Sequence, residues 1–411
     1  MRILFVHRHF PGPFRSLAQA FGAMDNTTVL FLSERGSKDL RIAKVRRLRL
    51  ATPLACDSKD EAECQSSMSI RHGVRTANVL LKLKKDGFVP DVIYSASTDG
   101  YSMYLRDIFP ESLFVVRADW FYNRDENHTF FTHNKPRPAS DFAISRIRNM
   151  FQYNALGDCD LAIANSNWQR LQYPPMLQEK IEIVHEGVDT EFFSPVFGSR
   201  FKQEGMNLSN VQELVTFSAR RAGPSQGFPI FTRSLPKILS SRPDCHVLIM
   251  CSGIEDDGGR ALNSKDAAAV TLAQYIEPQY HNRVHILDYK SVVDYRHLLR
   301  SYSVHVYLTA PYTLSAGLIE ALSCGCLVVG SDTPPVKEVI THGENGFLTN
   351  FWDSDALAET VLGVLERNSR FMSIREAARK TVMDNYNLDK QTEAQKQILL
   401  CAFEKKKNSA Y

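Results

Sequence analysis

The stretch at 308–332, LTAPYTLSAGLIEALSCGCLVVGSD, predicts the fold of this chain. It joins the end of one short apolar run, 304–308, to a second one, 326–329, through a segment of helical length. Ser315 is placed to cap the start of that helix, and Gly325 is placed to end it. Apolar strands that alternate with helices are typical of a parallel sheet buried on both faces.

The same alternation extends over the whole chain in two sets of six strands. The expected strands are 3–6, 28–32, 91–94, 113–116, 161–164 and 181–184 in the first set, and 214–218, 246–251, 284–287, 304–308, 326–329 and 346–349 in the second. Helical-length segments separate most of them. Two such sets predict two doubly wound, Rossmann-like α/β domains.

Changes in composition mark the expected domain boundaries. The segment 192–213 mixes Pro, Gly, Ser and Asn without a sustained period, which is typical of a connection between domains. After Phe351 the apolar spacing becomes helical, and a polar tail follows. We therefore expect a first domain over 1–195, a linker over 196–213, a second domain over 214–384, and a C-terminal helix over 385–411 that packs back on the first domain.

The composition is that of an ordinary globular protein. The 411 residues are 44% hydrophobic and 23% charged, with a formal net charge of +3, which disfavours disorder and a nucleic-acid-binding tail. The eight cysteines include no CxxC pair, so we expect reduced cytosolic thiols rather than a zinc site or a disulfide framework. The apolar run at 3–6 is too short for a signal peptide, and no run reaches the roughly 18 residues of a spanning helix. We expect a cytoplasmic protein whose contact with a membrane, if any, is peripheral.

The basic segment RIAKVRRLRL at 41–50 has two interpretations. Its basic side chains could contact the anionic inner face of a membrane. The same residues also suit a strand with a solvated basic face, which is the commoner arrangement. Nucleic-acid binding is disfavoured, because the net charge is small and no known binding module is recognisable.

Residues directly after the expected strands are the candidates for a ligand site, because ligands bind at the carboxyl ends of parallel strands. The backbone N–H groups from Ser315 to Leu318 open a helix with the small residues Ala316 and Gly317, and they could hold a diphosphate. Glu320 falls on the same helix face as Ala316 and could accept hydrogen bonds from a ribose. An ordinary capped helix with a solvated glutamate is the alternative.

The first expected strand is followed by FPGPF at 10–14. Gly12 permits a close approach of the backbone to a ligand, and Pro13 suits the first turn of a helix. A plain strand-to-helix turn explains the same residues, so both interpretations of Gly12 stay open.

The segment 308–332 resembles the retaining glycosyltransferases of family four, and other segments match that family in the same order. These are VHEGVDTEFFSP at 184–195, ARRAGPSQGFPIFTRSLPKIL at 219–239 and PPVKEVITHGENGFL at 334–348, while FPGPF and ANSNWQRLQYP at 164–174 suit a bacterial polysaccharide-type subgroup. The resemblance covers most of the chain. It implies the GT-B fold, in which two Rossmann-like domains face each other.

The resemblance also implies a reaction. A retaining enzyme of this family moves a sugar from a nucleotide diphosphate sugar to an acceptor, here a glycan, a lipid-linked molecule or a small molecule, as in polysaccharide biosynthesis. The nucleotide sugar is then a substrate, and neither a cofactor nor a metal is implied. Basic side chains and a helix N-terminus neutralise the charge that develops on the leaving diphosphate. By this resemblance Arg220 takes the family's first basic position, and Glu320 is the second of its paired glutamates.

Two positions depart from the family pattern. Gln226 stands where the family has Lys or Arg, so it can donate a hydrogen bond but brings no charge, and Arg221 is a candidate to supply one. Tyr312 stands where the family has its first glutamate. Both departures favour an alternative, a degenerate GT-B protein that binds a nucleotide or glycan as a regulatory or partner subunit. A nucleotide-sugar epimerase of the same fold is a third interpretation.

Residues of the first domain are expected to meet the acceptor. RADW at 117–120 follows a predicted strand, and Asp119 could orient or deprotonate an acceptor hydroxyl, or merely cap the next turn. His7 and His9 alternate along a strand end, so at most one of them points into the cleft. The candidate catalytic residues are Arg220, Asp119 and His9; the candidate donor-binding residues are Gly12, Gln226, Ser315, Ala316, Gly317, Leu318 and Glu320; no metal ligand is expected.

Overall fold

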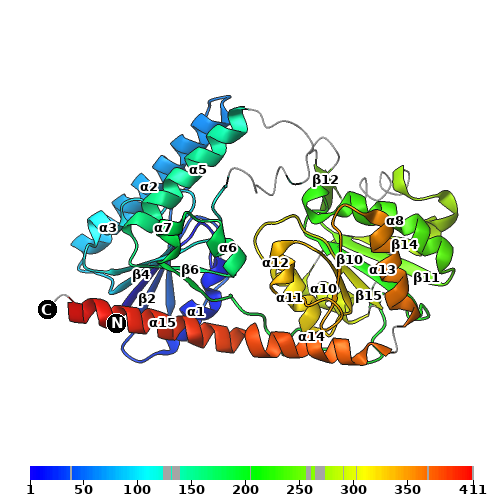
Figure 1. Ribbon diagram of the computed structural model, residues 1–411. Helices are drawn as coiled ribbons and strands as arrows, with labels where there is room; N and C mark the ends of the chain where they lie inside the picture. The colour runs from blue at the N-terminus through cyan, green and yellow to red at the C-terminus, as the bar shows by residue number, and fades with distance from the viewer. Residues whose placement is uncertain are drawn as a thin grey trace. The chain divides into compact units, whose positions relative to one another are not determined.

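The computed structural model describes residues 1–37, 39–123, 131, 139–203, 205–255, 261–263, 274–289, 291–301, 303–367 and 370–409 (Figure 1). The chain divides into two units. The first unit takes the described residues up to 187 except Phe131, together with the helix α15 (Leu388–Ser409). The second unit takes Phe131 and the described residues from Val188 to Asn387.

A parallel sheet forms the centre of the first unit. Its described strands run in the order β3-β2-β1-β4-β5-β6-β7, and every neighbouring pair is parallel. The strands are β1 (Arg2–Val6), β2 (Thr28–Ser33), β3 (Val45–Arg49), β4 (Val92–Ala96), β5 (Leu113–Arg117), β6 (Leu161–Ala164) and β7 (Ile181–Ile183). All six strands expected in this half are present, so the short apolar runs of the sequence predicted them correctly.

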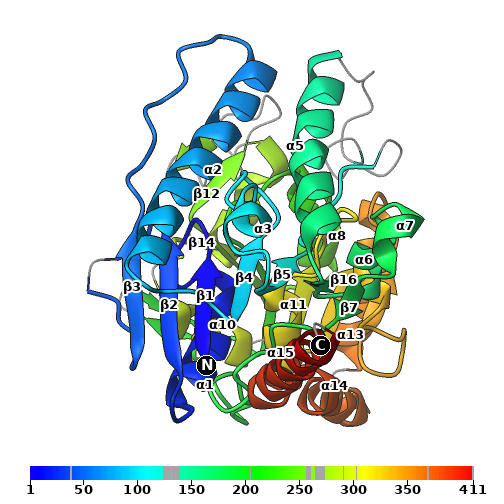
Figure 2. The same ribbon diagram turned by 90° about the vertical axis from the view of Figure 1, so that its left-hand side faces the viewer.

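Helices cover both faces of this sheet. They are α1 (Arg15–Ala23), α2 (Glu61–Lys85), α3 (Leu105–Ile108), α5 (Ala139–Asp158), α6 (Asn167–Leu171), α7 (Pro175–Gln178) and α15, with a 3-10 turn at Gly12–Phe14. Leu4 and Val6 of β1 pack in one cluster with α2 and α5, which lie side by side in Figure 2. Ile3 and Phe5 pack in the other cluster, which includes α1 and the fully buried Leu399 of α15. Alternate residues of one strand therefore serve opposite cores.

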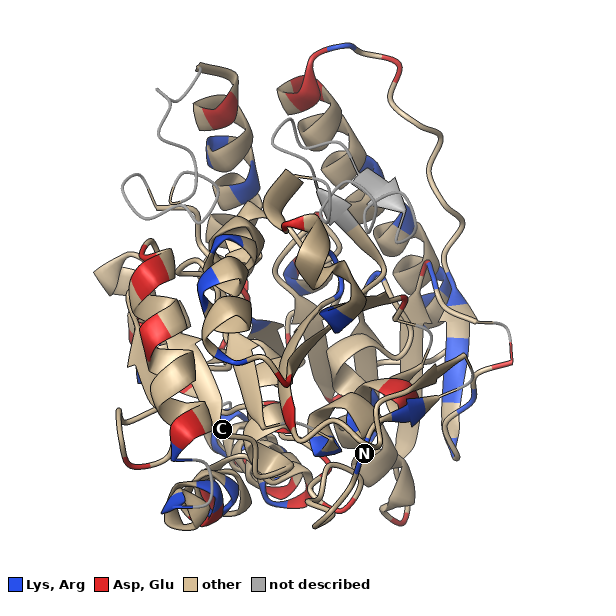
Figure 3. Ribbon diagram, turned by 90° about the vertical axis from the view of Figure 1, so that its right-hand side faces the viewer, with Lys and Arg blue, Asp and Glu red and all other residues tan. Residues whose placement is uncertain are grey.

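The basic segment at 41–50 forms the edge strand β3, as its commoner interpretation predicted. Val45–Arg49 pairs in parallel with β2, and Figure 3 shows basic residues along this edge. The Arg47 Nε atom donates to Ser33 Oγ at 3.0 Å, and its guanidinium carbon lies 4.7 Å from the centre of the Phe10 ring. The strand accounts for the basic pattern without a membrane, and peripheral membrane association stays a prediction. Among the described residues, none of the helices combines the length and apolar character needed to span a bilayer.

Gly100 allows a direct test of how α2 packs on the loop after β4. Its φ is +77°, and a Cβ atom would lie 2.2 Å from the backbone oxygen of Ser69. Gly100→Ala is expected to lower the free energy of unfolding by about 2–4 kcal/mol, through strain at positive φ plus displacement of α2. Gly87→Ala is the matched control, because Gly87 has a φ of +87° but open space at its Cβ position. Urea unfolding followed by circular dichroism measures both variants, and equal losses would contradict this packing.

The second unit contains a second parallel sheet. Its described strands run in the order β14-β11-β10-β15-β16-β17, which is the 3-2-1-4-5-6 order of a dinucleotide-binding fold. They are β10 (Glu213–Ala219), β11 (Cys245–Cys251), β14 (Val284–Leu287), β15 (Val304–Tyr307), β16 (Val328–Ser331) and β17 (Phe347–Thr349). All six strands expected in this half are present, and the predicted fold class of two doubly wound parallel-sheet units is confirmed.

The helices of the second unit lie on both faces of its sheet. They are α8 (Phe228–Ser241), α10 (Val292–Arg300), α11 (Ala316–Ser323), α12 (Pro334–Lys337), α13 (Ser354–Glu366) and α14 (Met372–Asn385), with 3-10 turns at Pro224–Gln226 and Pro278–Arg283. A hairpin of β12 (Gly253–Glu255) and β13 (Ala261–Asn263) follows β11. Val215 and Phe217 of β10 pack in the cluster of α8 and α13, whereas Leu214 packs in that of α10, α11 and α14.

The expected linker at 196–213 is part of the second unit. It contains a hairpin of β8 (Lys202–Gln203) and β9 (Met206–Asn207), and Phe201 and Leu208 are buried in that unit's core. The change of unit falls between Gly187 and Val188, before the expected boundary at 195. Two-residue strands are too short to show a period, so composition alone suggested a free connection.

Candidate functional site

A pocket opens at the carboxyl ends of β10 and β15, where the strand order of the second sheet reverses. It has two adjoining chambers of about 710 and 300 Å³, which share Ser218, Ala219, Arg220, Tyr307 and Ser315. The larger chamber also holds Gln226 and Tyr312, and the smaller one also holds Tyr289, Tyr295 and Glu320. We call the two chambers together the switch-point pocket. This is the position at which open α/β sheets bind ligands.

The start of α11 forms one wall of the switch-point pocket. Ser315 caps the helix, because its Oγ accepts a hydrogen bond from Gly317 N at 3.2 Å, and Gly325 follows the helix end with a φ of +74°; both predictions are confirmed. Ala316 is exposed, whereas the Leu318 side chain is fully buried in the core. Any role of Leu318 toward a ligand therefore rests on its backbone.

A tight turn before α8 brings Gln226 into the larger chamber. Gly227 has a φ of +65°, and a Cβ atom there would lie 2.5 Å from the Leu308 side chain, so the turn requires glycine. Ala310 N donates to Ser225 O at 2.7 Å and joins this turn to the loop after β15. Gln226 and Tyr312, the two departures from the family pattern, consequently line the same chamber as Arg220.

Arg220 supplies exposed positive charge to both chambers. It directly follows β10, and its guanidinium makes no hydrogen bond or ion pair with any described residue. Arg221 also lines the larger chamber. An exposed guanidinium that no carboxylate engages is available to a phosphate, which it can contact with two parallel hydrogen bonds.

Glu320 is a half-buried carboxyl in the smaller chamber. Burial raises its pKa to about 7, and a hydrogen bond from Tyr295 lowers it in part. Burial also raises the pKa of Tyr289, and this tyrosine senses both charges, since Glu320 raises its pKa while Arg220 lowers it. The smaller chamber thus combines a carboxyl acceptor with aromatic walls, beside the positive charge of Arg220.

In the first unit, the side chains of His7 and His9 have different surroundings. The Nδ1 atom of His7 lies 2.8 Å from His9 O, and burial lowers its pKa, while Asp119 partly raises it. His9 is exposed, and the charges that affect its pKa belong to Arg8, Arg35, Asp99 and Glu34 rather than to Asp119. Of the two histidines, only His7 therefore has a pKa that Asp119 affects.

Gly12 has a packing role that the sequence of the chain did not reveal. Its φ is +51°, and a Cβ atom would lie 2.5 Å from the His7 ring. Glycine is needed so that the His7 side chain can occupy this place. Gly12 lies in the first unit, whereas the other candidate donor-binding residues belong to the second.

Asp119 belongs to a charge network at the carboxyl ends of β5 to β7, in which the arginine is buried and the two carboxylates are partly exposed. The buried Arg117 guanidinium donates to Asp119 and to Glu186, and Asn165 also donates to Glu186 at 3.1 Å. Burial opposes the charge of Arg117, but the two carboxylates hold its pKa above the usual range. Asp119 is thus tied to an arginine, which favours a role in orientation. Glu186 was not predicted as a site residue, because it lies 69 residues along the chain from Arg117.

A second buried network surrounds Glu34, which follows β2. Its Oε2 atom accepts a hydrogen bond from Tyr101 at 2.8 Å and lies 3.2 Å from His72 Nε2. The His72 and Tyr101 rings stack with centres 4.8 Å apart. This network connects α2 with the ends of β2 and β4. Among the described residues, no group of three or more His, Cys, Asp and Glu side chains is placed to hold a metal ion.

Two family models match the chain. The model described as "Glycosyl transferase family 4 group" matches residues 25–193, and that described as "Glycosyl transferases group 1" matches 212–367. Among curated proteins, the phosphatidyl-myo-inositol mannosyltransferase of Mycolicibacterium smegmatis is 26% identical over 204 residues, 48% of this chain and 46% of that protein. The D-inositol 3-phosphate glycosyltransferase of the same organism is 27% identical over 252 residues, 58% of this chain and 53% of that protein. The chain spans about half the length of these relatives.

Solved structures share the fold of the whole chain. HepE from Anabaena, solved in complex with UDP-glucose, superposes with a TM-score of 0.70 at 16% identity and covers 98% of this chain and 100% of its own. Sucrose-phosphate synthase from Thermosynechococcus elongatus gives a TM-score of 0.74 at 15% identity, with 98% of this chain and 99% of its own covered. From the two family models and the shared fold, we conclude that the chain belongs to the family-four type of glycosyltransferases with the GT-B fold.

Proposed function

We propose that the chain is a retaining, metal-independent glycosyltransferase that moves a sugar from a nucleotide diphosphate sugar to a glycan, lipid-linked or small-molecule acceptor. The observation that carries the proposal is the switch-point pocket, where Arg220, the capped start of α11 and Glu320 line two adjoining chambers. Positive charge and helix N–H groups suit a diphosphate, and a carboxyl acceptor suits the hydroxyls of a ribose.

In this proposal each group has a defined task. Arg220 and the N-terminus of α11 stabilise the negative charge that grows on the leaving diphosphate. The ionised carboxylate of Glu320 accepts hydrogen bonds from the hydroxyl groups of the ribose. In the first unit, Asp119 and His7 orient the acceptor hydroxyl, with Arg117 holding the Asp119 carboxylate in place.

The test begins with binding and ends with the product. Isothermal titration against UDP, GDP and ADP identifies the base, and UDP sugars come first because HepE is described in complex with UDP-glucose. Release of nucleotide is then measured with inositol and malate-type acceptors, because relatives are named for phosphatidyl-myo-inositol, for D-inositol 3-phosphate and for N-acetyl-alpha-D-glucosaminyl L-malate. Proton NMR of the product reports its anomeric configuration, and activity in excess EDTA tests metal independence. An inverted product or loss of activity in EDTA would refute those parts of the proposal.

A regulatory nucleotide-binding subunit is the second candidate. Gln226 and Tyr312 favour it, because both line the larger chamber without the charge that the family places there. Tight nucleotide binding without turnover across all donors and acceptors is the result that would support this candidate over an enzyme.

Gln226→Lys tests whether the larger chamber lacks a charge at this turn. The added ammonium is expected to tighten nucleoside diphosphate binding about tenfold, since a charge-assisted hydrogen bond contributes about 1.5–3 kcal/mol. Gln226→Met is the matched control, because it keeps the length of the side chain without charge. Isothermal titration measures both variants. Equal affinities of the Lys and Met variants would show that position 226 does not face the diphosphate.

A further inference from the structure

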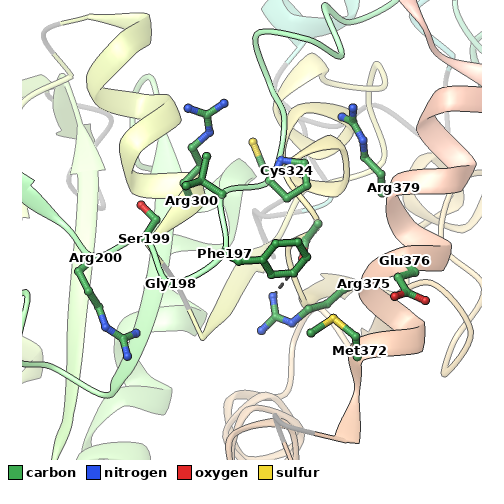
Figure 4. A pocket seen from close by; sticks show the side chains of 13 residues that line it. Phe197, Gly198, Ser199, Arg200, Arg300, Cys324, Met372, Arg375, Glu376 and Arg379 are labelled. Carbon is green, nitrogen blue, oxygen red and sulfur yellow. Dashed lines mark hydrogen bonds between the residues drawn. The ribbon is translucent and has the colours of Figure 1, made fainter.

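The second unit contains another cavity, of about 240 Å³, that shares no lining residue with the switch-point pocket (Figure 4). It lies between the segment 195–200, the C-terminal end of α11 and one face of α14. We call it the arginine cavity, because Arg200, Arg300, Arg375 and Arg379 line it beside a single acidic side chain, Glu376.

Two of these arginines are bound to neutral oxygens alone. Arg300 Nε donates to Ser194 O at 2.7 Å, and Arg379 Nη1 donates to Ser323 O at 2.8 Å. Neither guanidinium has a described carboxylate within ion-pair distance, although both are partly buried. Burial lowers the pKa of both groups; the neighbouring Arg296 lowers that of Arg300 further, whereas Glu191 partly raises that of Arg379. Four arginines beside one acidic lining residue leave this cavity with an excess of positive charge.

Part of this arrangement is structural. Arg379 holds the carbonyl of Ser323, the last residue of α11, and Arg375 Nη1 donates to Gly325 O, just after the helix, at 3.0 Å. Cations at this end complement the helix dipole. These contacts do not use every N–H group of the arginines that line the cavity. The Nε and Nη2 atoms of Arg379 and the Nη1 atom of Arg300 donate to no described residue, and they remain for a ligand.

The mouth of the cavity is apolar. Phe197 is 81% exposed and Met372 is 45% exposed, both large hydrophobic side chains left in water. In Figure 4 the Phe197 ring lies beside Arg375 and Met372, while the Glu376 carboxylate points away from the ring. An anion that also carried an apolar group would cover these side chains and meet the charge behind them.

We propose that the arginine cavity binds a small organic anion, a phosphate or carboxylate joined to an apolar or aromatic group. The anionic head accepts hydrogen bonds from Arg300 and Arg379. The apolar body covers Phe197 and Met372. Because the cavity adjoins the end of α11 opposite to the switch-point pocket, its occupant is chemically and spatially separate from a nucleotide donor.

Phenyl phosphate is the probe, with inorganic phosphate and phenol as its two halves. Isothermal titration with the full chain is expected to give at least fivefold tighter binding of phenyl phosphate than of either half. Phe197→Ala is expected to weaken phenyl phosphate about fivefold, because the ring is exposed and its loss leaves no hole in the core. Glu376→Gln is expected to tighten the binding of phenyl phosphate about threefold, because it removes the charge of the single acidic residue in the lining.

Matched variants distinguish the arginine cavity from the switch-point pocket and from a lipid-binding surface. Glu359→Gln removes one exposed carboxylate of α13 outside the cavity and is expected to leave the affinity unchanged. Arg220→Ala should also leave it unchanged, and a loss there would place phenyl phosphate in the switch-point pocket and overturn the proposal. The proposal would also be overturned if neither Phe197→Ala nor Glu376→Gln changed the affinity for phenyl phosphate. A third outcome is that the protein sediments with phosphatidic-acid vesicles but does not bind phenyl phosphate. That result would assign the cavity to a lipid headgroup and overturn the proposal of a free small molecule.

Discussion

Glu320→Gln is expected to stabilise the protein in alkaline solution while weakening its binding of nucleotide. Burial raises the pKa of Glu320 from 4.5 to about 7, so the folded state binds more protons than the unfolded state between these values. The free energy of unfolding therefore falls as the pH rises through that window. The cost of ionising the half-buried carboxyl is up to about 3 kcal/mol once the pH exceeds the folded pKa. Glutamine avoids this cost.

Urea unfolding at pH 4 and at pH 8 measures the effect. The variant is expected to match the wild type at pH 4, where the carboxyl is protonated in both states, and to exceed it at pH 8. A constant difference between the two pH values would mean that ionisation of Glu320 is not the cause. In titrations at pH 8 the same variant is expected to bind nucleoside diphosphate about tenfold more weakly, because its amide replaces a charged acceptor. Unchanged affinity would remove Glu320 from the proposed ribose contact.

Arg220→Ala is expected to weaken nucleoside diphosphate binding by about 10- to 100-fold without lowering the stability of the fold. The guanidinium is exposed and makes no hydrogen bond or ion pair with any described residue, so its removal breaks no such bond. A charge-assisted contact to phosphate is worth about 1.5–3 kcal/mol, which sets the expected loss. The free nucleoside, which carries no phosphate, is expected to bind the variant and the wild type equally.

Arg233→Ala is the matched control, since Arg233 is an exposed arginine of α8 outside both chambers. It should leave both affinities unchanged. If Arg220→Ala weakened the nucleoside as much as the diphosphate, the contact would lie at the nucleoside, and the assignment of Arg220 to the leaving group would be wrong.

The strands were predictable because buried parallel strands are short apolar runs that differ from the helices between them. In β10, Leu214 and Val215 face opposite cores, so both faces demand apolar residues and the run is continuous. β3 is an edge strand whose side chains are only partly buried, and its basic residues left a membrane interpretation open. The hairpin of β8 and β9 has strands too short to carry any period.

The site was predictable where it depends on local structure. Ser315 and Gly325 act through the chain immediately beside them, so their types reveal the ends of α11. The network of Arg117 and Glu186 depends on the register of three separate strands, which one sequence does not encode in its spacing. His7 and His9 could not be told apart for the same reason, since the contact between Gly12 and the His7 ring arises only once the loop is folded.

The helix α15 gives the first unit a discontinuous sequence, with consequences for the order in which the protein is made. Leu399 is fully buried against α1, and Lys406 Nζ pairs with Asp160 at 2.8 Å, so residues translated after the second unit complete a core that begins before it. The second unit emerges entirely before that helix does. On the ribosome the second unit can therefore finish folding first, while the first unit keeps an apolar groove beside α1 open until α15 emerges.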